Sequence, residues 1–147
     1  MAKKNKPLPE LSWLLPRVKV TRVLSLFSFF ALLAVLLLWN LLHFDFQDYK
    51  QVSIIVLFEF AALLVVAPGV VLGSPYAHVW TAFIANLYFL KGVLAFIDPS
   101  RTWLGIMEIF LSVSLFLSAM MYSRWRSQLN RVRYAQTDAE RPPLSAQ

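Results

Sequence analysis

Four apolar runs of about twenty residues each constrain the fold of this chain more than any other feature. They cover about residues 23–42, 52–72, 76–97 and 103–122. A helix of about twenty apolar residues spans the hydrocarbon core of a bilayer, which is about 30 Å thick, and its backbone hydrogen bonds are satisfied internally, as lipid requires. The sequence is also 59% hydrophobic, against roughly 45–50% in soluble domains. The pattern therefore predicts an all-α integral membrane protein, a four-helix up-down-up-down bundle.

Basic residues concentrate at the two ends of the chain. Of the 14 lysines and arginines, six precede residue 23 and five follow residue 122, and the net charge is +6. A basic chain can bind nucleic acid, but this distribution is typical of a membrane protein with both termini in the cytoplasm. The first apolar run is longer than the roughly 7–15 residues of a secretory signal, and no small-residue cleavage site follows it. We therefore predict a retained span, a lipid bilayer as surroundings and no nucleic-acid partner.

The segments outside the spans, residues 1–22 and 123–147, are predicted to be cytoplasmic tails. Proline lacks an N–H and fixes its φ, so the first tail should form no long helix. Its prolines are Pro7, Pro9 and Pro16. Residues 13–15, Trp-Leu-Leu, could lie on the anionic inner surface, but a solvated tail is the preferred interpretation. Residues 123–133 are predicted to extend the fourth helix, and the polar tail after residue 134 to be disordered.

The connection between the second and third spans is very short. Gly73 is predicted to take the left-handed position after the second helix, Ser74 to cap the third helix, and Pro75 to begin it. Such a tight link makes these two spans antiparallel neighbours. The Pro68-Gly69 pair just before it predicts a bend or a weakened turn near the inner end of the second span.

Three charged residues interrupt the predicted spans, namely Glu59, Lys91 and Glu108. At about 1.5 Å per helical residue, all three lie at a similar depth in the outer half of the membrane. Charges in a bilayer are costly and mark pairing or function. We predict a contact between Lys91 and Glu108, with Glu59 either sharing Lys91 or carrying a proton. Asn86, near mid-membrane, is grouped with this polar cluster and is predicted to hydrogen-bond between helices.

The cluster has two interpretations. In the first, a buried ion pair fixes the register of the bundle. In the second, Glu59, Lys91 and Glu108 line an aqueous cavity of a small, oligomeric proton-coupled carrier or channel. For Lys91 alone there is a third possibility, in which its long stem snorkels to the outer headgroups, although its Cα–Cβ bond points the other way.

Small residues recur along the fourth span. Gly105, Ser112 and Ala119 stand seven apart, and Ser114 and Ser118 stand four apart. These spacings allow close helix approach in lipid. They favour a non-enzymatic membrane component that assembles with itself or with another membrane protein, and the carrier or channel is the alternative function.

Catalytic, cofactor-binding and metal-binding residues are not predicted. There is no cysteine, and no Ser-His-Asp set, paired-histidine helix motif or glycine-rich phosphate loop is present. His43, Asp45 and Asp48 in the first loop offer metal ligands, but no second cluster completes a shell, so a solvated loop is preferred. His43 and His78 fall near opposite membrane faces and cannot share one metal. We therefore expect no enzymatic activity and no cofactor.

The second half of the chain carries a pattern of glycine, aromatic and charged residues. It consists of Gly73, Tyr76, Trp80, Leu87, Tyr88, Phe89, Gly92, Glu108, Tyr122, Ser123 and Arg124. This pattern resembles the family known as domain of unknown function 2069. The resemblance covers about half of the chain, and the first span matches by hydropathy alone. In that family a histidine often stands before the glycine of the third span, where this chain has Lys91. The resemblance implies a small four-span protein of Gram-negative inner membranes with no assigned activity.

Overall fold

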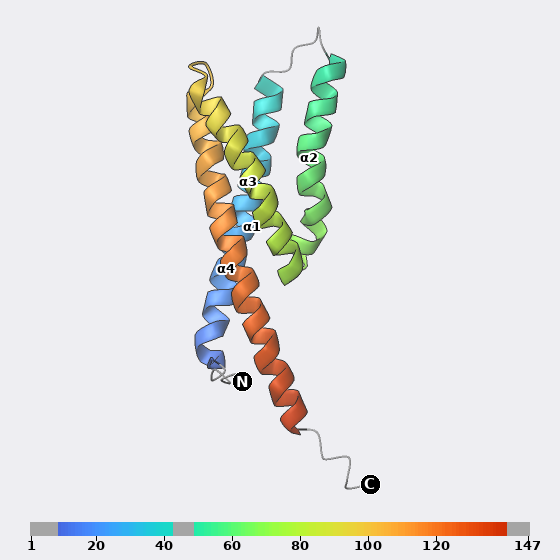
Figure 1. The fold of residues 1–147 in the computed structure, drawn as a ribbon, viewed down its shortest axis with the longest axis vertical. Coiled ribbons are helices and arrows are strands. Elements are labelled where there is room, and N and C mark those ends of the chain that lie inside the picture. Colours follow the sequence, from blue (N-terminus) through green and yellow to red (C-terminus); the bar gives the residue numbers. More distant parts are fainter. Residues whose placement is uncertain (1–8, 43–48, 141–147) are drawn as a thin grey trace, which may run out of the picture.

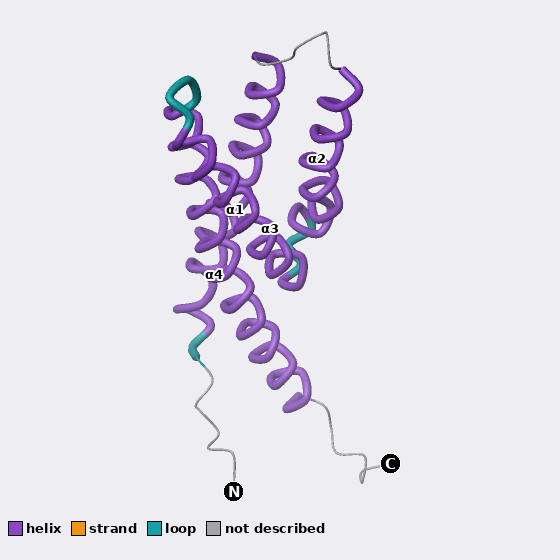
Figure 2. Tube along the Cα trace, turned by 45° about the horizontal axis from the view of Figure 1, so that its top comes forward, coloured by secondary structure: helices purple, strands orange, loops and turns teal. Residues whose placement is uncertain are grey.

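The computed structural model describes residues 9–42 and 49–140, and these residues form four helices (Figure 1). The helices are α1 (Leu11–Leu42), α2 (Tyr49–Val71), α3 (Pro75–Ile97) and α4 (Thr102–Glu140). Successive helices run in opposite directions, and the described loops are the two turns after α2 and α3 and the residues before α1 (Figure 2). We call the end where α1 begins and α4 ends the terminal end, and the opposite end the loop end. The all-α up-down-up-down bundle is thus confirmed.

Three of the helices are long and apolar enough to cross a membrane, namely α1, α3 and α4. The shorter apolar helical segment Val56–Val71 lies in α2. Each predicted span lies within one helix or ends within one residue of it. Large apolar side chains face outward along all four helices, including Phe27, Leu57, Phe83 and Phe110. The protein is therefore a membrane helical bundle.

The closest helix contact joins α3 and α4. A Cβ atom added at Gly105 would lie 2.5 Å from the backbone nitrogen of Phe96, and one added at Gly92 would lie 3.0 Å from the backbone nitrogen of Ile109. The two backbones therefore touch where these glycines face each other, and a larger residue cannot be accommodated without moving a helix.

The small residues of α4 are used inside the bundle. Ser112, Ser118 and Ala119 are all buried, and the Ser114 hydroxyl lies 2.9 Å from that of Ser28 on α1. The prediction of close helix approach is confirmed. The partners of this face are α1 and α3 of the same chain.

The turn between α2 and α3 follows its sequence closely. Gly73 has φ +76°, and it is the left-handed residue that the sequence predicts. Ser74 N–H donates to the Gly69 carbonyl at 2.9 Å, and Gly73 N–H donates to the Val70 carbonyl at 3.1 Å, which is the Schellman pattern of helix ends. Pro75 begins α3 as expected. Ser74 occupies the capping position, but its side chain makes no capping bond, so that part of the prediction is wrong.

The helix α2 continues through Pro68 to Val71 without interruption. The amide of Leu72 donates to the Pro68 carbonyl at 3.0 Å, so the proline stands in the last turns of a continuous helix. Gly69 lies against α3, because a Cβ there would be 2.5 Å from the Ala77 Cβ. The Pro-Gly pair therefore allows a close α2–α3 approach and does not break the helix.

The two tails form more helix than the sequence predicts. α1 already begins at Leu11 and includes Pro16, and α4 continues past residue 134 to Glu140. The expected break at Pro16 and the expected disorder of residues 135–140 are therefore wrong, while Pro7 lies outside the described residues. The two segments beyond the α2–α3 turn, residues 11–22 and 123–140, form what we call the two-helix stalk (Figure 1).

Packing between the two stalk segments explains why α1 continues through Pro16. Leu14 is completely buried and Val18 is 6% exposed, and Val18 packs with Tyr122 and Leu129 of α4. Proline removes one helical hydrogen bond, but burial of these apolar side chains offsets that loss.

Candidate functional site

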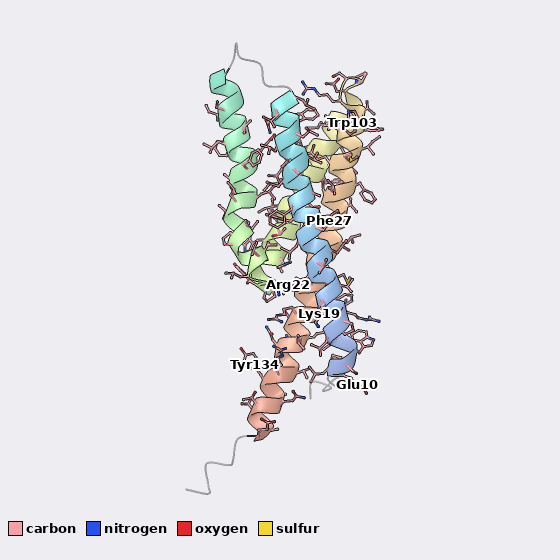
Figure 3. The ribbon with its side chains drawn as sticks, turned by 180° about the vertical axis from the view of Figure 1, so that it is seen from behind. Glu10, Lys19, Arg22, Phe27, Trp103 and Tyr134 are labelled. Atoms are coloured by element: carbon pink, nitrogen blue, oxygen red, sulfur yellow. The ribbon has the colours of Figure 1, made fainter. Side chains whose placement is uncertain are left out.

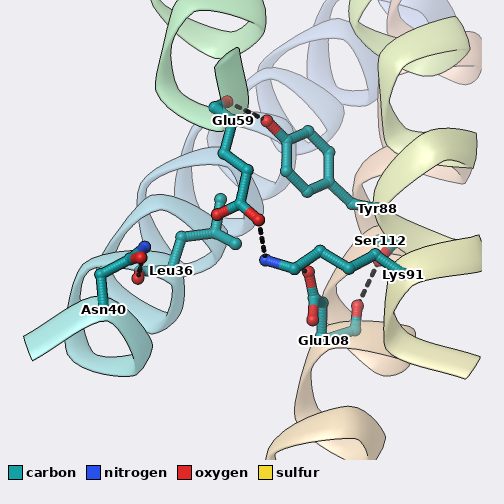
Figure 4. A network of polar contacts seen from close by, with 7 residues as sticks. All are labelled: Leu36, Asn40, Glu59, Tyr88, Lys91, Glu108 and Ser112. Carbon is teal, nitrogen blue, oxygen red and sulfur yellow. Dashed lines mark hydrogen bonds and ion pairs between the residues drawn. The ribbon is translucent and has the colours of Figure 1, made fainter. Parts of the chain in front are cut away.

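The structure brings Glu59, Lys91 and Glu108 together between three helices. The Lys91 ammonium lies 2.8 Å from Glu59 Oε1 on α2 and 3.7 Å from Glu108 Oε1 on α4 (Figure 4). The predicted Lys91–Glu108 contact is present, and Glu59 shares the same ammonium at the shorter distance. Whether the cluster has a function beyond structure stays a prediction.

Burial differs among the three side chains. Glu108 is 4% exposed, Glu59 is 17% exposed and Lys91 is 28% exposed. The Lys91 head points into the space between the helices (Figure 4), so its stem does not snorkel to the headgroups. The cluster therefore sits inside the bundle, and only part of it can be reached from outside.

Two hydroxyl groups hold the backbone beside the acids. The Tyr88 hydroxyl donates to the backbone carbonyl of Glu59, and the Ser112 hydroxyl donates to that of Glu108 (Figure 4). Tyr88 precedes Lys91 by three residues, so both side chains project from the same face of α3. Sequence reasoning did not assign either hydroxyl to the cluster, although this spacing was a signal for Tyr88.

The helix α1 contributes an aromatic ring to the surroundings of the ion cluster. The Trp39 ring centre lies 6.0 Å from the Lys91 ammonium and 4.9 Å from the Arg101 guanidinium. Arg101 also pairs with Asp98 at 3.4 Å in the turn at the loop end. A cation near an aromatic face is attracted to its π electrons, so Trp39 adds a favourable contact for Lys91 and no further acid.

Asn86 does not belong to the cluster. Its side chain is exposed and lines a hollow of about 140 Å³ between α3 and α4. It precedes Lys91 by five residues, which at 3.6 residues per turn places it about 140° away around the helix. Sequence analysis grouped Asn86 with Lys91 because they lie at a similar depth, but the two side chains project from different sides of α3. The assignment of Asn86 to the cluster is therefore wrong.

The charges of the cluster do not balance when both acids are ionised, because two carboxylates face one ammonium. An unbalanced charge in a membrane interior is costly, whereas a paired and hydrogen-bonded set recovers part of that cost. The arrangement can therefore act as a polar lock between helices, and it can also hold one proton that neutralises the set.

The described part of the chain brings no three histidine, aspartate or glutamate side chains together as metal ligands. The loop residues His43, Asp45 and Asp48 lie outside the described residues. His78 is completely buried beside the α2–α3 turn, with Nδ1 at 2.8 Å from the Ser74 carbonyl and its ring centre 4.1 Å from that of Tyr122. This histidine is thus part of the packing of the turn.

A second set of polar contacts ties the α2–α3 turn to the other two helices. Arg22 of α1 donates to the Val71 carbonyl at 3.0 Å, and the Tyr122 hydroxyl of α4 donates to the Gly73 carbonyl at 2.8 Å. These bonds satisfy carbonyls at the end of α2, and sequence reasoning did not find them. They fix the turn where the stalk begins.

Comparison with known proteins gives one family. The family described as "Predicted membrane protein (DUF2069)" matches residues 24–127, which include all of α2 and α3, most of α1 and α4, and the whole ion cluster. No curated protein and no solved structure matches the chain. With most of its length matched, the chain belongs to this family of predicted membrane proteins.

Proposed function

We propose that the protein is a non-enzymatic component of the bacterial inner membrane with both termini in the cytoplasm. The distribution of basic residues supports this orientation. The two-helix stalk carries Arg17, Lys19, Arg22, Arg124, Arg126, Arg131 and Arg133. Cysteine labelling tests the orientation cleanly, because the chain has no cysteine. A membrane-impermeant maleimide added to intact spheroplasts should label Ser100→Cys at the loop end but not Ser12→Cys, and the reverse pattern would contradict the proposal.

The ion cluster is proposed to act first as a structural lock. The observation that carries this role is that the Lys91 ammonium contacts carboxylates from two other helices, at 2.8 Å and 3.7 Å. α2 gains from such a contact, because among its described side chains only Leu63, Val66 and Val70 are buried. These three belong to one apolar cluster that also includes side chains of α1 and α3. A polar contact inside lipid fixes one register, since sliding would leave charges unpaired.

Assembly with a transmembrane helix, from a second copy or from another membrane protein, is proposed for the free side of α2. A groove of about 630 Å³ runs between α2 and α3. Its lining consists of Phe58, Ala61, Ala62, Val65, Val66, Gly69, Tyr76, Ala77, Trp80 and Ile84. Small residues on a membrane-facing surface let another helix approach closely, and this groove presents Ala61 and Ala62.

Co-purification tests the assembly. The protein is extracted in mild detergent, and its partners are identified by mass spectrometry and its mass by light scattering. Ala62→Phe, which fills the groove, should abolish the association, while Ala34→Phe on the exposed surface of α1 should preserve it. A monomer without a reproducible partner, or equal effects of the two variants, would contradict assembly through this groove.

A small proton-coupled carrier is the second candidate function, and the excess of one carboxylate in the cluster favours it. Such a carrier needs an acid that gains and loses a proton inside the membrane. Reconstituted vesicles would be tested for flux driven by a pH gradient. Loss of flux in both Glu59→Gln and Glu108→Gln would support the carrier, and unchanged flux would leave the structural lock as the role of the cluster.

A further inference from the structure

One face of α1 stays uncovered where the stalk meets the membrane-spanning part. A groove of about 470 Å³ is lined there by Lys19, Val20, Val23, Leu24 and Phe27. The exposed fractions are 65% for Val20, 67% for Val23 and 68% for Phe27. The predicted first span begins at residue 23, so the groove extends from the membrane surface into the hydrocarbon region.

Helix geometry extends this face toward the start of α1. At 100° per residue, Trp13 and Pro16 lie on the same side as Val20 and Phe27, and both are exposed. The buried Leu14 and Val18 lie on the other side, where Val18 packs with Tyr122 and Leu129 of α4. The uncovered face is therefore a continuous apolar stripe along the outside of α1, and Figure 3 labels Lys19 and Phe27 along it.

Two cations stand on the two edges of this stripe. Relative to Val20, Arg17 lies about 60° to one side and Lys19 about 100° to the other. The Arg17 guanidinium lies 3.8 Å from the Trp13 ring centre and 5.6 Å from that of Trp125 on α4, so contacts from both stalk segments hold it in place. Both cations precede the first residue of the predicted span by about one to two turns, which is the height of the headgroups.

We propose that this face, defined by Trp13, Arg17, Lys19 and the groove from Val20 to Phe27, binds one anionic phospholipid. The phosphate pairs with the Lys19 ammonium, which lines the groove, Arg17 adds positive charge at the other edge of the stripe, and an acyl chain follows the groove. Charge complementarity selects an anionic headgroup, since basic residues beside the membrane attract anionic lipid. A soluble acidic protein or nucleic acid would match the cations but could not reach Phe27 within the hydrocarbon. A phospholipid carries both the anionic headgroup and the apolar chain in one molecule.

Native mass spectrometry of the full chain tests the proposal. The protein in detergent is titrated with phosphatidylglycerol and, separately, with phosphatidylcholine. In the double variant Arg17→Gln/Lys19→Gln, the affinity for phosphatidylglycerol should fall roughly ten- to thirtyfold, and the affinity for phosphatidylcholine should change little. The control, Arg131→Gln/Arg133→Gln, removes the same charge from exposed positions farther along the stalk, and it should bind like the wild type.

A variant that keeps every charge distinguishes binding in the groove from non-specific electrostatic attraction of anionic lipid. Val23→Trp fills the groove and should also reduce phosphatidylglycerol binding severalfold, while circular dichroism and gel filtration verify the fold. Equal binding of the two lipids by the wild type, equal losses in the two double variants, or full binding by Val23→Trp would each overturn the proposal. None of these outcomes depends on the proposed orientation or on assembly through α2.

Discussion

Lys91 on α3 and Glu59 on α2 form an ion pair with 2.8 Å between the ammonium and the carboxylate oxygen. The Tyr88 hydroxyl joins the same two helices through the Glu59 carbonyl. Together with the apolar cluster that α2 shares with α1 and α3, these polar contacts determine where α2 lies. The pair is therefore central to the stability of the bundle, and the following predictions test it and the contacts around it.

Replacing Lys91 by methionine should strongly destabilise the protein. The change removes the only ammonium that contacts Glu59 and Glu108 among the described residues and leaves two carboxylates facing each other. Losing one partner of a buried ion pair costs about 3–5 kcal/mol. Thermal unfolding in mild detergent would measure the loss. Arg133→Met, at an exposed cation of the stalk, is the matched control, and an equal effect of the two substitutions would refute this prediction.

Glu108→Gln should be tolerated better than Lys91→Met. It leaves one ammonium and one carboxylate, so the cluster becomes neutral, whereas Lys91→Met leaves two negative groups. The Glu108 oxygen also lies farther from the ammonium, at 3.7 Å. We expect a loss of no more than about 1 kcal/mol, comparable to a single hydrogen bond. A larger loss for Glu108→Gln than for Lys91→Met in the same unfolding assay would contradict the charge balance proposed here.

Gly105→Ala should destabilise the α3–α4 contact by about 1–3 kcal/mol, as overpacking does. The new Cβ would lie 2.5 Å from the Phe96 backbone nitrogen, and a backbone atom cannot move aside alone. Gly69→Ala is the comparison, because its new Cβ would meet the Ala77 Cβ, also at 2.5 Å, but no backbone atom of α3 closer than 3.9 Å. Melting temperatures should therefore fall more for Gly105→Ala, and the opposite order would show that the two helices are not in backbone contact.

Tyr122→Phe should loosen the α2–α3 turn. It removes the hydroxyl that donates to the Gly73 carbonyl at 2.8 Å, and an unsatisfied buried carbonyl costs about 1–3 kcal/mol. Hydrogen exchange followed by mass spectrometry should show faster exchange in peptides that cover residues 69–78. Tyr134→Phe, at a tyrosine that is 72% exposed, should leave this exchange unchanged, and unchanged exchange in both variants would count against the role of Tyr122.

Sequence alone predicted the features that depend on local chemistry. The apolar runs gave the four helices, and Gly73 followed by Pro75 gave the turn, because left-handed φ and a first-turn proline are local requirements. Depth placed Glu59, Lys91 and Glu108 together correctly. Depth alone also grouped Asn86 with them, because the rotation of α3 around its axis was not considered.

Features that depend on contacts between distant segments were not predictable in the same way. The helix through Pro16 depends on packing of Val18 with Leu129, which lie far apart in the sequence. The burial of the small residues of α4 depends on which helix covers them, and spacing does not reveal whether that helix belongs to the same chain. The hydroxyl bond from Tyr88 to the Glu59 carbonyl depends on the position of α2.

A charge exchange between Glu59 and Lys91, made in a Glu108→Gln background, tests the central contact most directly. The background is needed because a carboxylate placed at position 91 would otherwise face that of Glu108. Glu59→Lys alone and Lys91→Glu alone each place like charges together, and each should lower the melting temperature sharply. The double exchange restores opposite charges at the same two positions and should recover most of the loss, with a coupling of about 0.5–3 kcal/mol in a double-mutant cycle. A double variant as unstable as the sum of its single changes would contradict the account, because the two residues would then not be in contact.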